Sequence, residues 1–228
     1  MRICVLFFIV FMTAQTTTAQ IHEAGLLAGG GNYIGDVGST RYIAPRTPAL
    51  GILYKWNTSP RYAYRASAMY MTIQGTDARS DIPARQDRNY EFKNHIKELS
   101  AGLEFNFLDF NLHEFGITAS PYVYSGISWF FYNALYFNNG EALEYNTANA
   151  FAIPMAAGVK SNLLPHLVIG LEINARYTFT DNLDGSNASG SPVGNSGFGN
   201  TNSNDWYVFS GISLTYTFGR KPCYCTGK

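Results

Sequence analysis

The sequence predicts an all-β fold: an eight-stranded antiparallel up-and-down transmembrane β-barrel with short periplasmic turns and long extracellular loops. Eight segments alternate apolar and polar residues, which is the pattern of strands with one apolar and one polar face. Charged residues make up only 14% of the chain, against about 25% in a typical soluble domain, and 15% of the residues are aromatic. The surface of the folded chain is therefore expected to contact something other than water.

The N-terminal residues predict a secretory signal peptide at 1–19. Arg2 precedes an apolar run at 3–11 that is too short to cross a bilayer, and Thr17 and Ala19 fit a small-residue cleavage site. A buried strand is the alternative. We expect the barrel to occupy residues 20–219 and a periplasmic tail to occupy residues 220–228.

Eight segments supply the predicted strands. In chain order they are HEAGLLAGG (22–30), PALGILYKW (48–56), RYAYRASAMYMT (61–72), HIKELSAGLEFNF (95–107), YVYSGISWFFYNALYF (122–137), FAIPMAAGVK (151–160), LVIGLEINARYTFT (167–180) and DWYVFSGISLTYTF (205–218). The first, second and fifth alternate weakly, and the other five alternate clearly. The seventh is the clearest case: its odd positions from Leu167 to Phe179 are apolar. It exceeds the usual soluble strand of about 5–6 residues, whereas a tilted membrane strand needs about 9–11.

The connections alternate in length. Roughly four, eleven and six residues follow the second, fourth and sixth segments, and roughly 15, 18, 12 and 24 follow the first, third, fifth and seventh, as expected of periplasmic turns and extracellular loops. Aromatic residues near the segment ends predict girdles at the membrane interfaces, with a place in a core as the alternative for each. They are Tyr54, Trp56, Tyr62, Tyr122, Trp129, Tyr136 and Trp206.

Charged residues on the polar faces of these strands are expected to lie inside the barrel. Eight strands leave a lumen just wide enough for side chains, so we expect an ion-pair network that fills and stabilises it. A conducting pore or an active site is the alternative. The residues are Arg65, Glu98, Glu104, Lys160, Glu172 and Arg176.

The sequence does not predict an enzyme, a cofactor or a metal site. None of the four histidines has a zinc-type spacing partner. His95, near Glu98 and Ser100, is the local candidate for a hydrolase site, but a strand points His95 and Ser100 to opposite faces. Lys+Arg and Asp+Glu are equal at 16 each, so no net field favours nucleic acid.

The longest predicted loop, 181–205, is rich in Gly, Asn and Ser and is expected to be flexible. Within it, Asp181, Asp184 and Asn187 are candidate calcium ligands, although they lack EF-hand spacing. The segments 33–45 and 80–92 combine Tyr, Arg and Asp with Gly and Pro. This composition predicts ordered loops with a contact role, and plain solvated loops are the alternative.

The last predicted strand carries a pattern that resembles the C-terminal signal read by the barrel-assembly machinery. A polar residue and a glycine precede spaced hydrophobic residues that end in an aromatic one. The residues are Ser210, Gly211, Leu214, Tyr216 and Phe218. The barrel-assembly machinery is therefore an expected partner during biogenesis.

Two cysteines, Cys223 and Cys225, follow this strand, and the only other cysteine, Cys4, lies in the predicted signal peptide. Pro222 ends the strand because it cannot donate to the ladder. Three fates remain open for the pair: a strained local disulfide, a metal site that needs further ligands, or a bond to another protein.

Several stretches, loops and tail included, resemble the PorG-like outer-membrane barrels associated with the type IX secretion system. They are GGGNYIGDVG, ALGILYKWN, SPRYAYR, ELSAGLEFNF, PYVYSGIS, NARYTFTDNLDGSN and NDWYVFSGISLTYTFGRKPCYC. The resemblance implies a barrel in the outer membrane of a Gram-negative bacterium that is an accessory structural part of the secretion apparatus, which in some relatives also serves gliding motility.

The resemblance further implies partners and an attachment point. Family members associate, from the periplasmic side, with a ring built of a lipoprotein and a partner protein, and no catalytic residues come with the family. Cys223 and Cys225 match its terminal Cys-x-Cys and become candidates for attachment to the ring lipoprotein. The alternative function is an independent small outer-membrane barrel, embedded in lipid, that acts as a narrow pore or adhesin.

Overall fold

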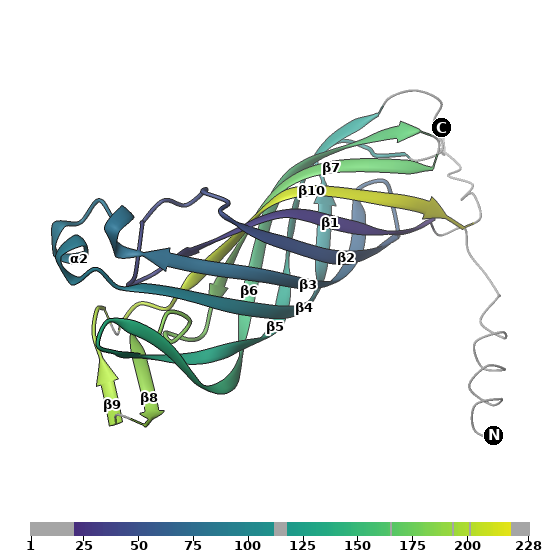
Figure 1. Cartoon of the computed structure of the whole chain (residues 1–228). Coiled ribbons are helices and arrows are strands. Elements are labelled where there is room, and N and C mark those ends of the chain that lie inside the picture. The colour runs from purple at the N-terminus through teal and green to yellow at the C-terminus, as the bar shows by residue number, and fades with distance from the viewer. Residues whose placement is uncertain (1–20, 112–117, 165, 193, 201, 220–228) are drawn as a thin grey trace, which may run out of the picture.

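The computed structural model describes residues 21–111, 118–164, 166–192, 194–200 and 202–219. It confirms the predicted fold: eight antiparallel strands close into a barrel in the order β1-β10-β7-β6-β5-β4-β3-β2 (Figure 1). The strands are β1 (Ile21–Ile34), β2 (Thr47–Asn57), β3 (Tyr62–Thr76), β4 (Glu91–Asn106), β5 (Ala119–Asn138), β6 (Glu141–Leu164), β7 (Leu167–Thr178) and β10 (Trp206–Phe218). Each of the eight predicted segments overlaps one of these strands and extends at most two residues beyond it. The predicted signal peptide and tail lie outside the described residues.

Strands β1 and β10 close the barrel. They pair antiparallel from His22 opposite Phe218 to Ile34 opposite Trp206. The ring therefore has no free edge, and its backbone groups can bond to one another, as hydrocarbon surroundings require. The helical elements of the described chain, η1 (Asp77–Arg79) and α2 (Pro83–Arg88), are too short to span a membrane.

The two faces of each strand differ as predicted. In β7, Leu171 is 62% exposed, whereas Glu172 beside it is 4% exposed. The same contrast separates Leu103 from Glu104 in β4. In these parts of β4 and β7, apolar side chains thus cover the outside of the barrel and charged ones point into it.

The connections gather at two ends of the barrel. Residues 58–61, 107–118 and 165–166 connect strands at one end, which we call the turn end. Residues 35–46, 77–90, 139–140 and 179–205 connect strands at the other, which we call the loop end. Figure 1 shows α2, β8 (Asn187–Ser191) and β9 (Gly194–Gly197) together at the loop end.

One connection differs from its expected length. The loop of roughly 12 residues expected after the fifth segment is the tight hairpin Asn139–Gly140, with positive φ values of 52° and 91°. Both residues are of the type that two-residue hairpins favour. The expectation fails because β5 and β6 stay paired as far as Asn138 opposite Glu141, beyond the stretch in which the sequence alternates.

One girdle residue also differs. Tyr122 is 1% exposed and points into the barrel, whereas Tyr54, Tyr62 and Trp129 are at least 40% exposed on the outside. The hydroxyl of Tyr122 bonds to an interior carboxylate, which explains its inward position.

Candidate functional site

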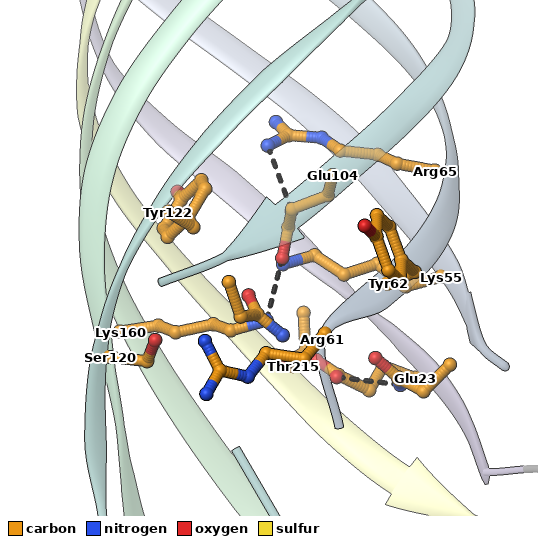
Figure 2. Close-up of polar contacts among 12 residues, drawn as sticks. Glu23, Lys55, Arg61, Tyr62, Arg65, Glu104, Ser120, Tyr122, Lys160 and Thr215 are labelled. Carbon is orange, nitrogen blue, oxygen red and sulfur yellow. Dashed lines mark hydrogen bonds and ion pairs between the residues drawn. The ribbon is translucent and has the colours of Figure 1, made fainter. Parts of the chain in front are cut away.

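Glu104 of β4 lies at the centre of the barrel's polar interior and has no exposed surface. The Nζ atoms of Lys55 (β2) and Lys160 (β6) lie 2.8 Å and 2.6 Å from its carboxylate oxygens. Arg65 of β3 lies 3.5 Å from the same carboxylate. Figure 2 shows these cations converging on Glu104 from three strands. Three cations around one carboxylate require further negative charge nearby.

Glu172 of β7 supplies that charge. The Nη1 and Nη2 atoms of Arg65 donate to its two oxygens at 2.8 Å and 2.9 Å, which is the strong bidentate geometry. The Tyr122 hydroxyl donates to the same carboxylate at 2.7 Å. The Arg65 guanidinium also lies 4.6 Å from the centre of the Tyr124 ring, within the range of a cation–π contact.

A second ion pair lies nearer the loop end. The Nε and Nη2 atoms of Arg176 donate to the two oxygens of Glu98, each at 3.1 Å. The Tyr207 hydroxyl donates to Glu98, and Arg176 also donates to the Asn174 carbonyl at 2.7 Å. All six charged residues expected inside the barrel therefore lie there and take part in ion pairs.

Two further charged residues of the interior were missed by the sequence interpretation. Lys55 is one, and Glu23 of β1 is the other. Glu23 accepts hydrogen bonds from Asn57 at 2.8 Å and Thr215 at 2.7 Å. Both lie in weakly alternating segments, where the signal was a single charge in an otherwise apolar strand. With them the buried charges of the strand interior balance: Lys55, Arg65, Lys160 and Arg176 against Glu23, Glu98, Glu104 and Glu172.

The loop half of the interior is apolar, which the sequence interpretation did not foresee. Met71 and Ile73 of β3, Ile96 of β4 and Phe130 of β5 are buried there with Phe209 of β10 in one cluster. Aromatic rings connect this cluster to the ion pairs, since Phe130 lies 5.4 Å from Tyr207. The lumen is thus filled by a charged layer and an apolar layer.

Phe110 covers the charged layer at the turn end. Its side chain is 5% exposed, and its ring lies 4.8 Å from Nζ of Lys160. The Phe110 amide donates to the Pro60 carbonyl at 3.2 Å, which ties this connection to the neighbouring turn. At the rim, Arg61 forms an exposed ion pair with Asp109.

Three long connections at the loop end bond to one another, and we call residues 35–46, 77–90 and 179–205 the loop cap. Asp77 accepts hydrogen bonds from the Gly38 amide and the Arg88 guanidinium, both at 2.8 Å. Arg88 in turn donates to the Asp36 carbonyl at 2.7 Å. The Asn200 amide donates to the Asp36 carboxylate at 3.0 Å. The four contacts join all three connections.

Residues 181–205 differ from the expected flexible loop. They contain the β8–β9 hairpin, and Phe198 packs on Tyr90 and Phe137 with ring centres 5.3 Å and 5.4 Å away. The Arg88 guanidinium lies 4.6 Å from the centre of the Phe198 ring. These contacts hold the longest connection against the second connection and the β5–β6 hairpin.

The loop cap contains buried carboxyl groups. Asp205 accepts hydrogen bonds from the Tyr33 hydroxyl and from the Leu183 amide, and Asp184 accepts one from the Val37 amide at 3.1 Å. Burial raises the pKa of Asp184, and burial together with the charge of Asp184 raises the pKa of Asp205 well above its usual range. Burial also raises the pKa of Asp181 to about 6.

The candidate hydrolase residues do not come together. His95 faces outward, with Nδ1 3.0 Å from the Tyr70 hydroxyl, whereas Glu98 and Ser100 are buried in the interior. Within the described residues, no group of three or more His, Cys, Asp or Glu side chains is arranged to hold a metal ion. The candidate calcium ligands Asp181 and Asn187 instead bond to each other at 3.3 Å.

The assembly-signal residues occupy the closing strand. Leu214, Tyr216 and Phe218 point outward and are between 43% and 56% exposed. Gly211 lies opposite Gly29 at the seam, where an added Cβ would lie 2.4 Å from the Ala28 carbonyl. Cys223 and Cys225 lie outside the described residues.

No curated protein matches the chain. Among solved structures it is similar to a major outer membrane protein from Thermus thermophilus, with 16% identity over 88% of this chain and 100% of that one and a TM-score of 0.49. It is also similar to the Yersinia pestis attachment invasion locus protein Ail (10% identity, 88% and 100% covered, TM-score 0.48). The N-terminal β-barrel domain of Pseudomonas aeruginosa OprF gives 10% identity, 89% and 100% coverage and a TM-score of 0.46. Similarity at this level concerns the fold alone. A family model matches residues 2–227, and the chain therefore belongs to the family described as "Domain of unknown function (DUF6089)".

Proposed function

We propose that this protein is a non-enzymatic outer-membrane component of the type IX protein secretion machinery and, in gliding bacteria, of the motility apparatus. The loop end faces outward and the turn end faces the periplasm. There the protein anchors or stabilises a ring built of a lipoprotein and a partner protein. The main support for the proposal is the interior, which is filled with side chains. A filled interior leaves the outer surface, the loop cap and the tail as the parts that contact partners.

An outer-membrane position is supported by the exterior of the barrel. Large apolar side chains on the outside expose between 56% and 66% of their surface, among them Leu50, Ile127, Phe151 and Leu171. Exposing such apolar surface to water is unfavourable, whereas contact with lipid acyl chains is not. The expected signal peptide agrees with export from the cytoplasm. The two longest connections, 77–90 and 179–205, lie at the loop end, which agrees with the outward orientation of long loops in such barrels.

The tail starts on the side where a periplasmic ring would lie. Strand β10 runs toward the turn end and finishes at Phe218, directly before Gly219. In the proposal Cys223 or Cys225 bonds the ring lipoprotein through a disulfide, which the oxidising periplasm permits. The resemblance of this Cys-x-Cys to the terminal motif of PorG-like proteins motivates the assignment.

A conducting pore is the weaker alternative. A passage would have to cross the Glu104 network, the Glu98–Arg176 pair and the apolar layer around Phe130, all of which are buried. An adhesin is favoured over a pore by one observation, the mutual bonding of the loop cap through Asp77 and Arg88. In that case the loop cap, and not the tail, is the working part.

The proposal is tested by deleting residues 219–228 in a bacterium that uses the protein, and by a matched variant in which residues 187–197 are replaced with a short Gly-Ser linker. The proposal expects loss of secretion only in the tail deletion, with the barrel still inserted in both. Normal secretion by the tail deletion refutes it. A defect confined to the loop variant supports the adhesin.

The attachment is tested on non-reducing gels of native membranes. A reducible band of higher mass is expected in the wild type and in Thr226→Ala, a tail substitution that leaves both thiols in place. It should be lost in Cys223→Ser or in Cys225→Ser. A pattern unchanged in the double variant excludes the disulfide as the attachment.

A further inference from the structure

The outward face of β4 carries two unpaired cations. Lys93 and Lys97 are the only Lys or Arg side chains that the described barrel strands point outward, and both are exposed. Neither has a carboxylate within ion-pair distance among the described residues, whereas the four inward-facing cations, named above, all have hydrogen-bonded partners. His95 lies between the two lysines on the same face.

The two lysines begin where the apolar face of β4 ends. Outward positions from Phe105 back to Leu99 are apolar, and Lys97 is the next outward residue toward the loop end. Its register partners are Tyr70 of β3 and Phe131 of β5. Tyr and Trp mark the border of the hydrocarbon layer in membrane proteins. Lys97 therefore lies at the level of lipid headgroups on the loop side.

An apolar furrow leads away from Lys97 along the outside of the barrel. A groove of about 730 Å³ is lined by Lys97 together with Leu50, Ile52 and Leu99. A second groove of about 600 Å³ shares Ile52 and Leu99 with the first. The two grooves share a floor at Ala68, and Ala66 continues it toward the turn end. We call these joined grooves the β3 furrow.

We propose that the β3 furrow and the two lysines form a binding site for a phosphorylated, acylated glycolipid of the outer leaflet. One acyl chain lies along Ala66 and Ala68, and the phosphates lie against Lys93 and Lys97. Charge complementarity selects this occupant: two cations without protein partners face the headgroup layer, and basic clusters at that depth bind anionic headgroups. The site rests on the orientation proposed above, which places the loop end in the outer leaflet.

Native mass spectrometry of the purified full chain in detergent tests the site, with bisphosphorylated lipid A as the probe. Lys93→Gln combined with Lys97→Gln should lower lipid retention by at least about tenfold. The matched control is Arg41→Gln combined with Arg46→Gln, which removes the same charge from exposed positions elsewhere at the loop end and should retain the lipid. Equal retention by the lysine variant overturns the site.

Two further measurements distinguish a specific site in the furrow from non-specific electrostatic attraction between the lysines and any anionic lipid. Dephosphorylated lipid A should bind the wild type as weakly as bisphosphorylated lipid A binds the lysine variant, and phosphatidylglycerol, with a single phosphate, should compete poorly. Ala68→Phe fills the furrow from outside while both lysines keep their charge, and it should also weaken retention. If all three lipids bind equally, or if Ala68→Phe retains the lipid fully, the lysines attract lipid without a specific site in the furrow. Either result overturns the proposal.

The test is independent of secretion. Folding of each variant is checked by its heat-dependent migration on gels, so a loss of lipid cannot be confused with unfolding. A tail deletion that leaves secretion intact refutes the ring anchor and leaves lipid retention unaffected. Loss of the lipid site, conversely, leaves the ring anchor standing.

Discussion

Glu104→Gln should destabilise the barrel severely. The substitution removes the negative charge that Lys55, Lys160 and Arg65 share at 2.6–3.5 Å, in a position with no exposed surface. Removing one partner of a buried ion pair typically costs about 3–5 kcal/mol, because the remaining charge stays buried and uncompensated. With three cations affected, we expect a loss in the upper part of that range. This is a large share of the roughly 5–15 kcal/mol that stabilises a typical domain.

The assay is urea unfolding of the barrel refolded into lipid vesicles, followed by tryptophan fluorescence. Asp109→Asn is the control: it breaks the pair with Arg61, whose two side chains are 43% and 69% exposed, and should change stability by less than about 1 kcal/mol. Adding Lys160→Met to Glu104→Gln restores the interior charge balance and should recover about 0.5–3 kcal/mol relative to the sum of the single effects. A Glu104→Gln barrel within about 1 kcal/mol of the wild type would refute the assignment of Glu104 as the centre of the network.

Three further outcomes are expected. Asp181, Asp184 and Asp205 of the loop cap hold their protons more tightly in the folded than in the unfolded protein. The cap is therefore most stable below their ordinary pKa of about 4 and loses stability as the pH rises, through about 6 for Asp181. Limited proteolysis of residues 181–205 at pH 4.5 and 7 measures this, and equal resistance at the two pH values contradicts it. The wild type should give no steady channel in planar bilayers, and stable conductance steps would exclude a filled lumen. Gly102→Ala places a Cβ 2.2 Å from the Ser125 carbonyl and should cost about 1–3 kcal/mol in the urea assay, whereas an unchanged midpoint would mean that β4 and β5 move apart freely.

The exterior of the barrel was predictable because hydrocarbon imposes one rule on every strand. Alternation assigned Leu171 to the outside and Glu172 to the inside, since a charge on the lipid face is costly at that depth. The same rule failed for the apolar layer of the interior. Met69, Met71 and Ile73 share the inward parity of Arg65, whereas the residues that alternate with them, Tyr70, Thr72 and Gln74, carry polar groups. The polarity of the two faces is therefore reversed in this stretch, and alternation alone places its apolar side chains on the wrong side of the barrel.

Other features depend on contacts between distant parts of the chain. Tyr122 lies inward because Glu172, on β7, accepts its hydroxyl, and no local pattern records that partner. The β5–β6 hairpin continues past the alternating stretch because strands outside the membrane need no apolar face. Its Asn139–Gly140 turn was visible in the sequence as a favoured hairpin dipeptide, but it lay in a stretch interpreted as a loop.

The arrangement of charge separates what the inside and the outside of this barrel can do. Every inward-facing cation of the described strands has a carboxylate partner, so these strands leave no unpaired cation inside the barrel with which to attract an anion. The unpaired strand cations, Lys93 and Lys97, are on the outside instead. Attraction in the low-dielectric interior is strong enough to hold the paired groups in place, whereas the outer pair stays available to a ligand. The interior therefore accounts for stability, and recognition must be sought on the lipid face, the loop cap and the tail.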